Sequence, residues 1–226
     1  MFIGHFGAGL AAKKLDTAPS LGTLFMASQF IDLIWPVFLL TGLERVAVDP
    51  GNTAFTPLNF ISYPFTHSFL GVLIWGVLFG LVYYAIRKNW KTAILLGGLV
   101  LSQWILDFIT HRPDLPVFPW SDLKVGLGLW NSVALSLIVE SLIFIGGAYL
   151  YLKATQKTNR RGSIGLWALL IFLAVVYLMN VFGPVPESTE PIAYVGMSSW
   201  LLVAWAYWAD KNRQPVLNGI NQPQAA

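Results

Sequence analysis

Residues 102–116 read SQWILDFITHRPDLP, an apolar helical run that ends in three ionisable side chains, Asp107, His111 and Arg112. The first half of the run is typical of a helix in contact with lipid. Ionisable groups are costly at membrane depth, and those that occur there usually serve a site. The stretch therefore indicates a membrane helix that carries polar, functional groups near its end.

The composition of the whole chain is that of an integral membrane protein. Of its 226 residues, 56% are hydrophobic and 11% are charged, and the mean hydropathy is +0.62, whereas soluble domains are about 25% charged. Apolar runs take up nearly all of the length, so we predict one integral helical domain over residues 1–213 and a disordered polar tail over 214–226. The chain has no cysteine. Any metal must therefore be held by nitrogen and oxygen atoms.

Six apolar runs are long enough to cross a bilayer, because a span needs about 20 residues. We expect an all-α polytopic fold with six transmembrane helices, near residues 20–42, 65–86, 92–111, 128–152, 164–183 and 192–209. A shorter apolar helix at 2–12 can enter the membrane but cannot cross it alone. It lacks the basic start and the cleavage site of a secretory signal, so we expect it in the mature protein. Gly76 and Gly80 form a small-residue motif that predicts close helix packing.

The basic residues predict the orientation of the spans, since Lys and Arg are retained on the cytoplasmic side. Most of them fall on one side of the six-span arrangement: Lys13, Lys14, Arg87, Lys88, Lys91, Lys153, Lys157, Arg160, Arg161, Lys211 and Arg213. Only Arg45, Arg112 and Lys124 fall on the other side. We expect a cytoplasmic C-terminus, with the loops at 43–64, 112–127 and 184–191 outside. No basic stripe with interleaved aromatic residues indicates nucleic-acid binding.

All three histidines lie in or beside apolar helices. Asp107 and His111 are four residues apart, so they share one helix face about 6 Å apart along the axis. The pair either binds one metal, or the acid orients the imidazole, or His111 and Arg112 merely complement the dipole of a helix end beside Asp107. His67 opens the span at 65–86, where it either belongs to a capped helix N-terminus or joins His111 at the outer face.

The other ionisable groups within apolar helices are His5, Asp32 and Glu140. Pro36 cannot donate a hydrogen bond to the carbonyl oxygen of Asp32, so we expect the first span to bend or end there. A bend would bring Asp32 toward the outer side, whereas a straight helix would leave it about 15 Å below. Counted along their helices, His5 and Glu140 also fall near mid-membrane. Glu140 is either a buried acid bonded to Ser or Trp of a neighbouring span, or a general base or second-sphere carboxylate.

Together these residues offer a set of nitrogen and oxygen ligands for Zn²⁺ or a similar divalent transition metal: His5, Asp32, His67, Asp107 and His111. At these positions the sequence resembles the bacterial inner-membrane proteins described as membrane-bound metal-dependent hydrolases, which are likened to zinc-dependent phospholipase C. The resemblance covers roughly residues 1–120. The matching features are Gly4-His5, Asp32, Thr66-His67-Ser68, and Leu106-Asp107 followed by Thr110.

The sequence departs from the pattern of that family at three places. It has one acid, Asp32, where the family tends to have two, and Ile61–Pro64 where the family tends to have His-Arg-Gly. It also has Gln103 where the family tends to have a His, four residues before Asp107. We therefore expect one metal ion rather than two. His111, one turn beyond Asp107, is our candidate for the missing histidine.

The resemblance implies hydrolysis of an ester or phosphodiester bond in a lipid or lipid-linked substrate at the outer leaflet. A metal with an open position polarises the bond that is attacked and lowers the pKa of bound water to about 7. As catalytic residues we expect Glu140 as a base and Arg112 facing an anionic headgroup. The alternative is a membrane protein without enzymatic activity, in which the same residues form an ion or lipid path or a structural metal site. The lack of an internal repeat argues against a transporter.

Overall fold

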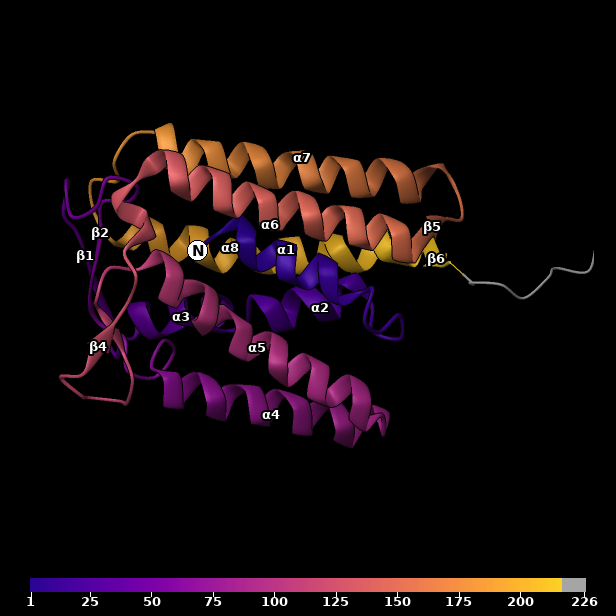
Figure 1. Cartoon of the computed structure of the whole chain (residues 1–226), viewed down its shortest axis with the longest axis horizontal. Helices are drawn as coiled ribbons and strands as arrows, with labels where there is room; N and C mark the ends of the chain where they lie inside the picture. The colour runs from indigo at the N-terminus through magenta and orange to yellow at the C-terminus, as the bar shows by residue number, and fades with distance from the viewer. Residues whose placement is uncertain (217–226) are drawn as a thin grey trace, which may run out of the picture.

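The computed structural model of the protein describes residues 1–216 and is all-helical apart from short two-stranded sheets (Figure 1). Its helices are α1 (Ile3–Ala12), α2 (Leu21–Ser28), α3 (Phe30–Leu40), α4 (Phe69–Arg87), α5 (Trp90–Thr110), α6 (Val133–Ala154), α7 (Arg160–Phe182) and α8 (Glu190–Lys211). The strands pair in antiparallel fashion as β1 (Arg45–Val48) with β2 (Leu58–Ser62), β3 (Leu115–Pro116) with β4 (Lys124–Val125), and β5 (Thr155–Lys157) with β6 (Arg213–Pro215). The expected all-α polytopic class is confirmed.

The helices long and apolar enough to cross a membrane match the predicted spans. Over the described residues, α4 to α8 each qualify, and α2 with α3 qualify as one bent pair. Counting that pair as one span gives the six predicted spans. The short helix α1 is likewise present and is too short to cross alone. The predicted tail at 214–226 lies outside the described residues except for 214–216, of which Gln214 and Pro215 belong to β6.

The prediction that the first span bends at Pro36 is wrong, because the bend lies at Gln29. The axes of α2 and α3 differ by 54°, while Pro36 sits inside α3. A proline removes one backbone hydrogen bond, and here its ring packs where Gly196 of α8 has no side chain, since a Cβ there would lie 2.6 Å from the ring. At the bend, the backbone amide of Ile31 donates to Gln103 Oε1 at 3.0 Å. The position of the bend therefore depends on a side chain from α5.

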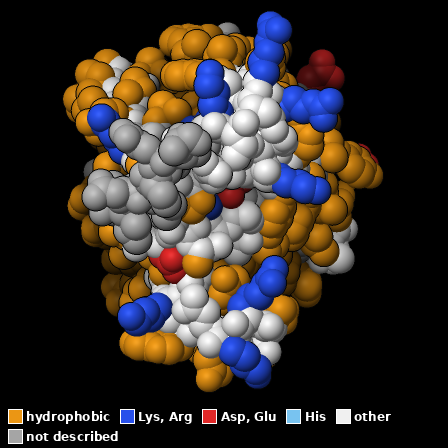
Figure 2. Space-filling view, turned by 90° about the vertical axis from the view of Figure 1, so that its right-hand side faces the viewer, with side chains coloured by type: hydrophobic (Ala, Val, Ile, Leu, Met, Phe, Trp, Pro, Cys, Tyr) orange, Lys and Arg blue, Asp and Glu red, His pale blue; other side chains and the backbone are white. Residues whose placement is uncertain are grey.

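Two ends of the bundle can be distinguished in Figure 1. Strands β1 to β4 gather at one end, which we call the hairpin end, and β5 and β6 lie at the other, which we call the tail end. Viewed from the tail end in Figure 2, Lys and Arg side chains are spread over the surface, and apolar side chains surround them. From this excess of basic residues at the tail end we predict that this end faces the cytoplasm. The orientation of the bundle in the membrane stays a prediction.

A buried ion pair connects the first and last helices at the tail end. Lys13 Nζ lies 3.1 Å from Asp210 Oδ2 and donates to the carbonyl of Pro19 at 2.7 Å. The backbone amide of Leu21 donates to the same carboxylate oxygen at 3.0 Å, and the hydroxyl of Tyr151 donates to Asp210 Oδ1. These bonds fix the turn between α1 and α2 against α6 and α8.

Glycine contacts bring α1 against α6. A Cβ on Gly147 would lie 2.1 Å from the carbonyl oxygen of Gly7, and a Cβ on Gly7 would lie 2.6 Å from that of Ile143. Backbones can approach so closely only where side chains are absent. Phe6 of α1 also packs in an aliphatic and aromatic core with Phe25 of α2 and Leu169 of α7. This packing sets the position of His5, which directly precedes Phe6 and Gly7 on α1.

Candidate functional site

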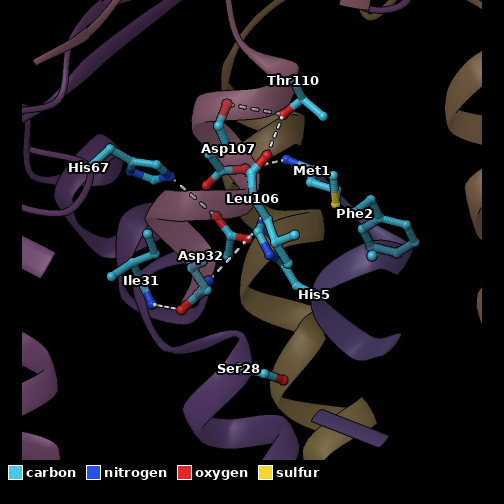
Figure 3. A network of polar contacts seen from close by, with 12 residues as sticks. Met1, Phe2, His5, Ser28, Ile31, Asp32, His67, Leu106, Asp107 and Thr110 are labelled. Carbon is cyan, nitrogen blue, oxygen red and sulfur yellow. Dashed lines mark hydrogen bonds and ion pairs between the residues drawn. The ribbon is translucent and has the colours of Figure 1, made fainter. Parts of the chain in front are cut away.

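Four of the five predicted metal ligands converge near the hairpin end of α5 (Figure 3). They come from separate segments: His5 from α1, Asp32 from α3, His67 from the loop before α4 and Asp107 from α5. Nε2 of His67 lies 3.3 Å from Asp32 Oδ1. Nε2 of His5 lies 3.8 Å from Asp32 Oδ2 and 3.0 Å from Asp107 Oδ1. The side chains thus form an alternating row of imidazoles and carboxylates.

Asp32 is held in this row by the bend that precedes it. It occupies the first turn of α3, and Gln103 Nε2 donates to its Oδ2 at 3.4 Å while Gln103 Oε1 accepts from Ile31 at the bend. Gln103 therefore positions the carboxylate of Asp32. The row lies about one helical turn inside the end of α5, because Asp107 precedes the last residue, Thr110, by three positions. His5 lies at the same level of the bundle, since its Nε2 is 3.0 Å from Asp107 Oδ1.

His67 is oriented from behind by a threonine and a carboxylate. Its Nδ1 lies 2.6 Å from the hydroxyl of Thr66, and that hydroxyl donates to Glu44 Oε2 at 2.6 Å. Since the hydroxyl has one hydrogen and gives it to the carboxylate, it accepts from the Nδ1–H of His67. Nε2 of a neutral His67 then carries a lone pair directed at Asp32. Two acceptors 3.3 Å apart need a cation between them, either a proton or a metal.

Glu44 is a site residue that the sequence did not reveal. It is 1% exposed, and its Oε1 accepts from the backbone amides of Phe65 and Thr66, both at 2.8 Å. It lies in a loop next to Arg45, outside every apolar run, so nothing in the hydropathy pattern distinguishes it from a solvated loop acid. Its burial against the Phe65–Thr66 segment, 21 and 22 residues later in the chain, is a tertiary effect.

Glu140 binds the N-terminus of α1. Its Oε2 accepts from the backbone amides of Phe2 at 2.8 Å and Gly4 at 3.3 Å. The first amides of a helix have no partner within the helix; here the contact of Gly4 is buried and that of Phe2 is partly buried. The expected partner, a Ser or Trp side chain of a neighbouring span, is not the one observed. Glu140 Oε1 has no hydrogen-bond partner within residues 1–216.

The Met1 ammonium group also lies in the row and forms an ion pair with Asp107 Oδ1. It is fully buried, like the His5 side chain. The α5 carboxylate therefore contacts two nitrogen atoms from the region of α1. This contact supplies a positive charge beside an acid that is itself 2% exposed.

His111 and Arg112 belong to a separate network closer to the loops. Nδ1 of His111 lies 2.9 Å from Asp114 Oδ1, which also accepts from the hydroxyl of Tyr63 at 2.9 Å. Nε of Arg112 donates to Asp114 Oδ2 at 3.1 Å, and its Nη2 donates to Asn59 at 2.7 Å. The structure thus does not bring His111 to the other four residues. Neither His111 nor Arg112 pairs with the Asp107 side chain.

This second network shifts the titration of two groups in the loops. Burial of Asp114 opposes its ionisation, but hydrogen bonds from His111 and Tyr63 outweigh that effect and hold the pKa of Asp114 below its usual value. Burial of Tyr63, together with the negative charge of Asp114, raises the pKa of the Tyr63 hydroxyl well above its usual value. The loop acid is therefore ionised and the phenol neutral at neutral pH.

Access to the row is uneven. The side chain of Asp32 is 32% exposed, whereas those of His5, His67 and Asp107 are between 0% and 4% exposed. Over residues 1–216, no three His, Asp or Glu side chains stand in an arrangement ready to hold a metal. The Met1 ammonium group takes up one oxygen of Asp107, and Asp32 lies between the two imidazoles. A metal would have to replace the ammonium group as the cation of the row.

Comparison with known proteins identifies the family. Residues 48–184 match the sequence profile of the family described as YdjM inner membrane protein. Comparisons with curated proteins and with solved structures gave no match. The matched segment includes His67, Asp107 and Glu140. It begins after His5 and Asp32, which it does not cover. Because it covers more than half of the chain, this integral membrane protein belongs to the YdjM inner membrane protein family.

Proposed function

We propose that the protein is a membrane-embedded, metal-dependent hydrolase. One divalent transition metal ion, zinc being the best match to the donors, would be held by four side chains: His5, Asp32, His67 and Asp107. The observation that carries the proposal is their convergence from four segments, with nitrogen-to-oxygen distances of 3.0 to 3.8 Å. Ligand atoms about 2.1 Å from a tetrahedral zinc ion lie roughly 3.4 Å from one another. Each neighbouring pair in the row therefore has about the spacing of two ligands on one ion, and the four side chains would have to close around the ion, since no three of them stand ready to hold it among residues 1–216.

The orientation of His67 supports the same assignment. Metal-binding histidines commonly donate their second ring N–H to an oxygen acceptor, which fixes the tautomer. Thr66 and Glu44 supply that acceptor chain here. The free lone pair of His67 is thereby directed at the carboxylate of Asp32, in the centre of the row.

The exposed position of Asp32 suggests where water and substrate would approach. When bound, the metal would supply a Lewis acid for the ester or phosphodiester oxygen and would acidify a water molecule. Glu140 Oε1, which has no hydrogen-bond partner among residues 1–216, remains our candidate for accepting a proton. Arg112, whose side chain is 36% exposed, remains our candidate for contact with an anionic headgroup. The substrate class we propose is a lipid or lipid-linked ester at the outer leaflet.

The experiment is metal analysis of protein purified in detergent, saturated with Zn²⁺ and then dialysed. We expect about one zinc per wild-type chain and a large loss in His67→Ala and Asp32→Asn. The matched control is His111→Ala, which removes a buried histidine whose partner is Asp114 outside the row, and it should retain the metal. Equal metal content in all four proteins, or none in the wild type, would refute the assignment.

Activity would be tested with the same proteins on phospholipids in mixed micelles, with products identified by mass spectrometry. We expect products from the wild type and from His111→Ala, and none from His67→Ala or after chelation. If the zinc-loaded wild type cleaves neither ester nor phosphodiester bonds, the protein binds metal but does not hydrolyse these lipids.

A second function, a purely structural network, is favoured by the ion pair between the Met1 ammonium group and Asp107. The positive charge of the Met1 ammonium group would then balance carboxylate charge in the row. The row would connect α1 to α3 and α5 without a metal. In this case the wild type would bind no zinc, while His67→Ala would still lower the melting temperature. The metal analysis therefore separates the two functions.

A further inference from the structure

We propose that a groove between α4 and α5 binds one acyl chain of an anionic phospholipid. The groove has a volume of about 540 Å³, within the usual range of about 300 to 1,000 Å³ for sites that bind small molecules. Residues lining it include Leu73, Gly76, Tyr84, Trp90, Gly98 and Leu101. None of its lining residues belongs to the row of histidines and acids, so this site is independent of the proposed hydrolase centre.

Small residues create the groove. A Cβ on Gly76 would lie 2.8 Å from the carbonyl oxygen of Gly97, and a Cβ on Gly80 would lie 2.9 Å from that of Ala93. The two helices therefore meet backbone to backbone, and no side chains fill the space outside the contact. Gly98 faces open space, since a Cβ there would meet no atom within 4 Å. Because Gly76 and Gly80 are already used within the chain, they are not available to pack a second copy.

The length of the groove suits one leaflet of the membrane. It extends along α4 from Leu73 to Tyr84, which is about 16 Å at 1.5 Å per residue. The hydrocarbon core of a bilayer is about 30 Å thick. A second membrane helix would pack along the whole length of α4 and α5, whereas a single acyl chain occupies half of it. On α5 the lining extends only from Trp90 to Leu101, the half of that helix nearest the turn to α4, which favours a lipid chain from the leaflet at the tail end.

Positive charge at the tail end of the groove fits an anionic headgroup. The turn between α4 and α5 carries Arg87, Lys88 and Lys91, all exposed. Within residues 1–216, none of them forms an ion pair. Tyr84 and Trp90 are exposed beside them, as is typical of aromatic residues at headgroup depth. Basic residues at this depth attract anionic lipids, by roughly fivefold in affinity for each Lys or Arg. The apolar groove and the basic turn thus recognise the two parts of one lipid.

The experiment is native mass spectrometry of delipidated protein titrated with dioleoylphosphatidylglycerol or with dioleoylphosphatidylcholine. We expect the first phosphatidylglycerol to bind at least tenfold more tightly. Gly98→Leu places a side chain in the groove and should weaken that binding at least tenfold. Gly146→Leu is the control, because a Cβ on Gly146 of α6 also meets no atom within 4 Å and Gly146 lies outside the groove. It should bind as the wild type does.

A second set of variants tests the headgroup contact without altering the helix packing. Replacing Arg87, Lys88 and Lys91 together with glutamine should reduce phosphatidylglycerol binding to the level of phosphatidylcholine. The control is Arg160→Gln with Arg161→Gln, at the same end of the bundle on α7, which should not change binding.

Three results would each overturn the proposal. They are equal affinity for the two lipids, phosphatidylglycerol binding that is unchanged in Gly98→Leu, and a dimer that Gly98→Leu dissociates, since a dimer would make a second copy the occupant. The zinc content of these variants should equal that of the wild type. Loss of lipid binding is thereby distinguishable from a failure of the proposed metal centre.

Discussion

Replacing Glu140 with alanine should release the N-terminus of α1 from the bundle. Glu140 Oε2 accepts from the amides of Phe2 and Gly4, at 2.8 Å and 3.3 Å. An enclosed donor without a partner costs about 1 to 3 kcal/mol, so losing both bonds should lower the free energy of unfolding by about 2 to 6 kcal/mol. Glu140→Gln keeps an acceptor oxygen and removes only the charge. We expect it to lose less than half as much.

Unfolding by sodium dodecyl sulphate in mixed micelles, followed by circular dichroism, measures this difference. Glu187→Ala is the control, because Glu187 is an exposed acid in the loop before α8, and it should unfold as the wild type does. Identical unfolding of Glu140→Ala and Glu140→Gln, or of Glu140→Ala and the wild type, would refute the reasoning.

The same two variants separate structure from chemistry at Glu140. Displacement of α1 would move His5 away from Asp32 and Asp107, so Glu140→Ala should also lose zinc. Glu140→Gln should keep both the fold and the metal. If Glu140 is the proton acceptor of the proposed hydrolase, the glutamine variant should lose hydrolysis alone.

Three further substitutions test the packing and the polar networks. Gly147→Ala should lower the free energy of unfolding by about 1 to 3 kcal/mol, because its Cβ would lie 2.1 Å from a backbone oxygen of α1. The control is Gly146→Ala, since Gly146 has open space around it. Equal free energies of unfolding for the two variants would contradict the contact. Asp210→Ala should cost about 3 to 5 kcal/mol, since it leaves the buried ammonium group of Lys13 without its anion; unchanged unfolding would mean that the pair is solvated. Asp114 has a lowered pKa in the folded state, so its stabilising effect is present above the unfolded pKa of about 3.9 and is lost as pH falls through the folded value. Asp114→Asn should therefore melt at a lower temperature than the wild type at pH 6, and the difference should shrink below about pH 4; a difference independent of pH would contradict this assignment.

The sequence predicts the spans well because span length and hydropathy are local properties. The apolar runs from 65 to 209 each become a long helix, and the run at 2–12 becomes the short helix α1. The bend at Gln29 could not be predicted in this way. It depends on Gln103, a residue 72 positions away from its partner Ile31, and the one local signal, Pro36, points to the wrong position.

Part of the candidate site can be predicted from the sequence, because ionisable groups in apolar helices are few and each one therefore stands out. His5, Asp32, His67 and Asp107 converge as expected for this reason. His111 does not, because α5 ends at Thr110 and the backbone of His111 is already extended, with ψ at 147°. Residues four apart share one face only within a helix, so the predicted pairing of His111 with Asp107 does not hold beyond the end of α5.

The place of α1 determines when the bundle can be completed during synthesis. Its polar partners, Asp107 and Glu140, follow it in the chain by 102 to 138 residues. Translation at about 5 to 20 residues per second leaves α1 without one or both of them for roughly 5 to 28 s after it is made. During this interval the leading amides of this ten-residue apolar helix lack the carboxylate that accepts their hydrogen bonds in the finished bundle. The polar contacts of α1 can therefore form only after α5 and α6 have been made.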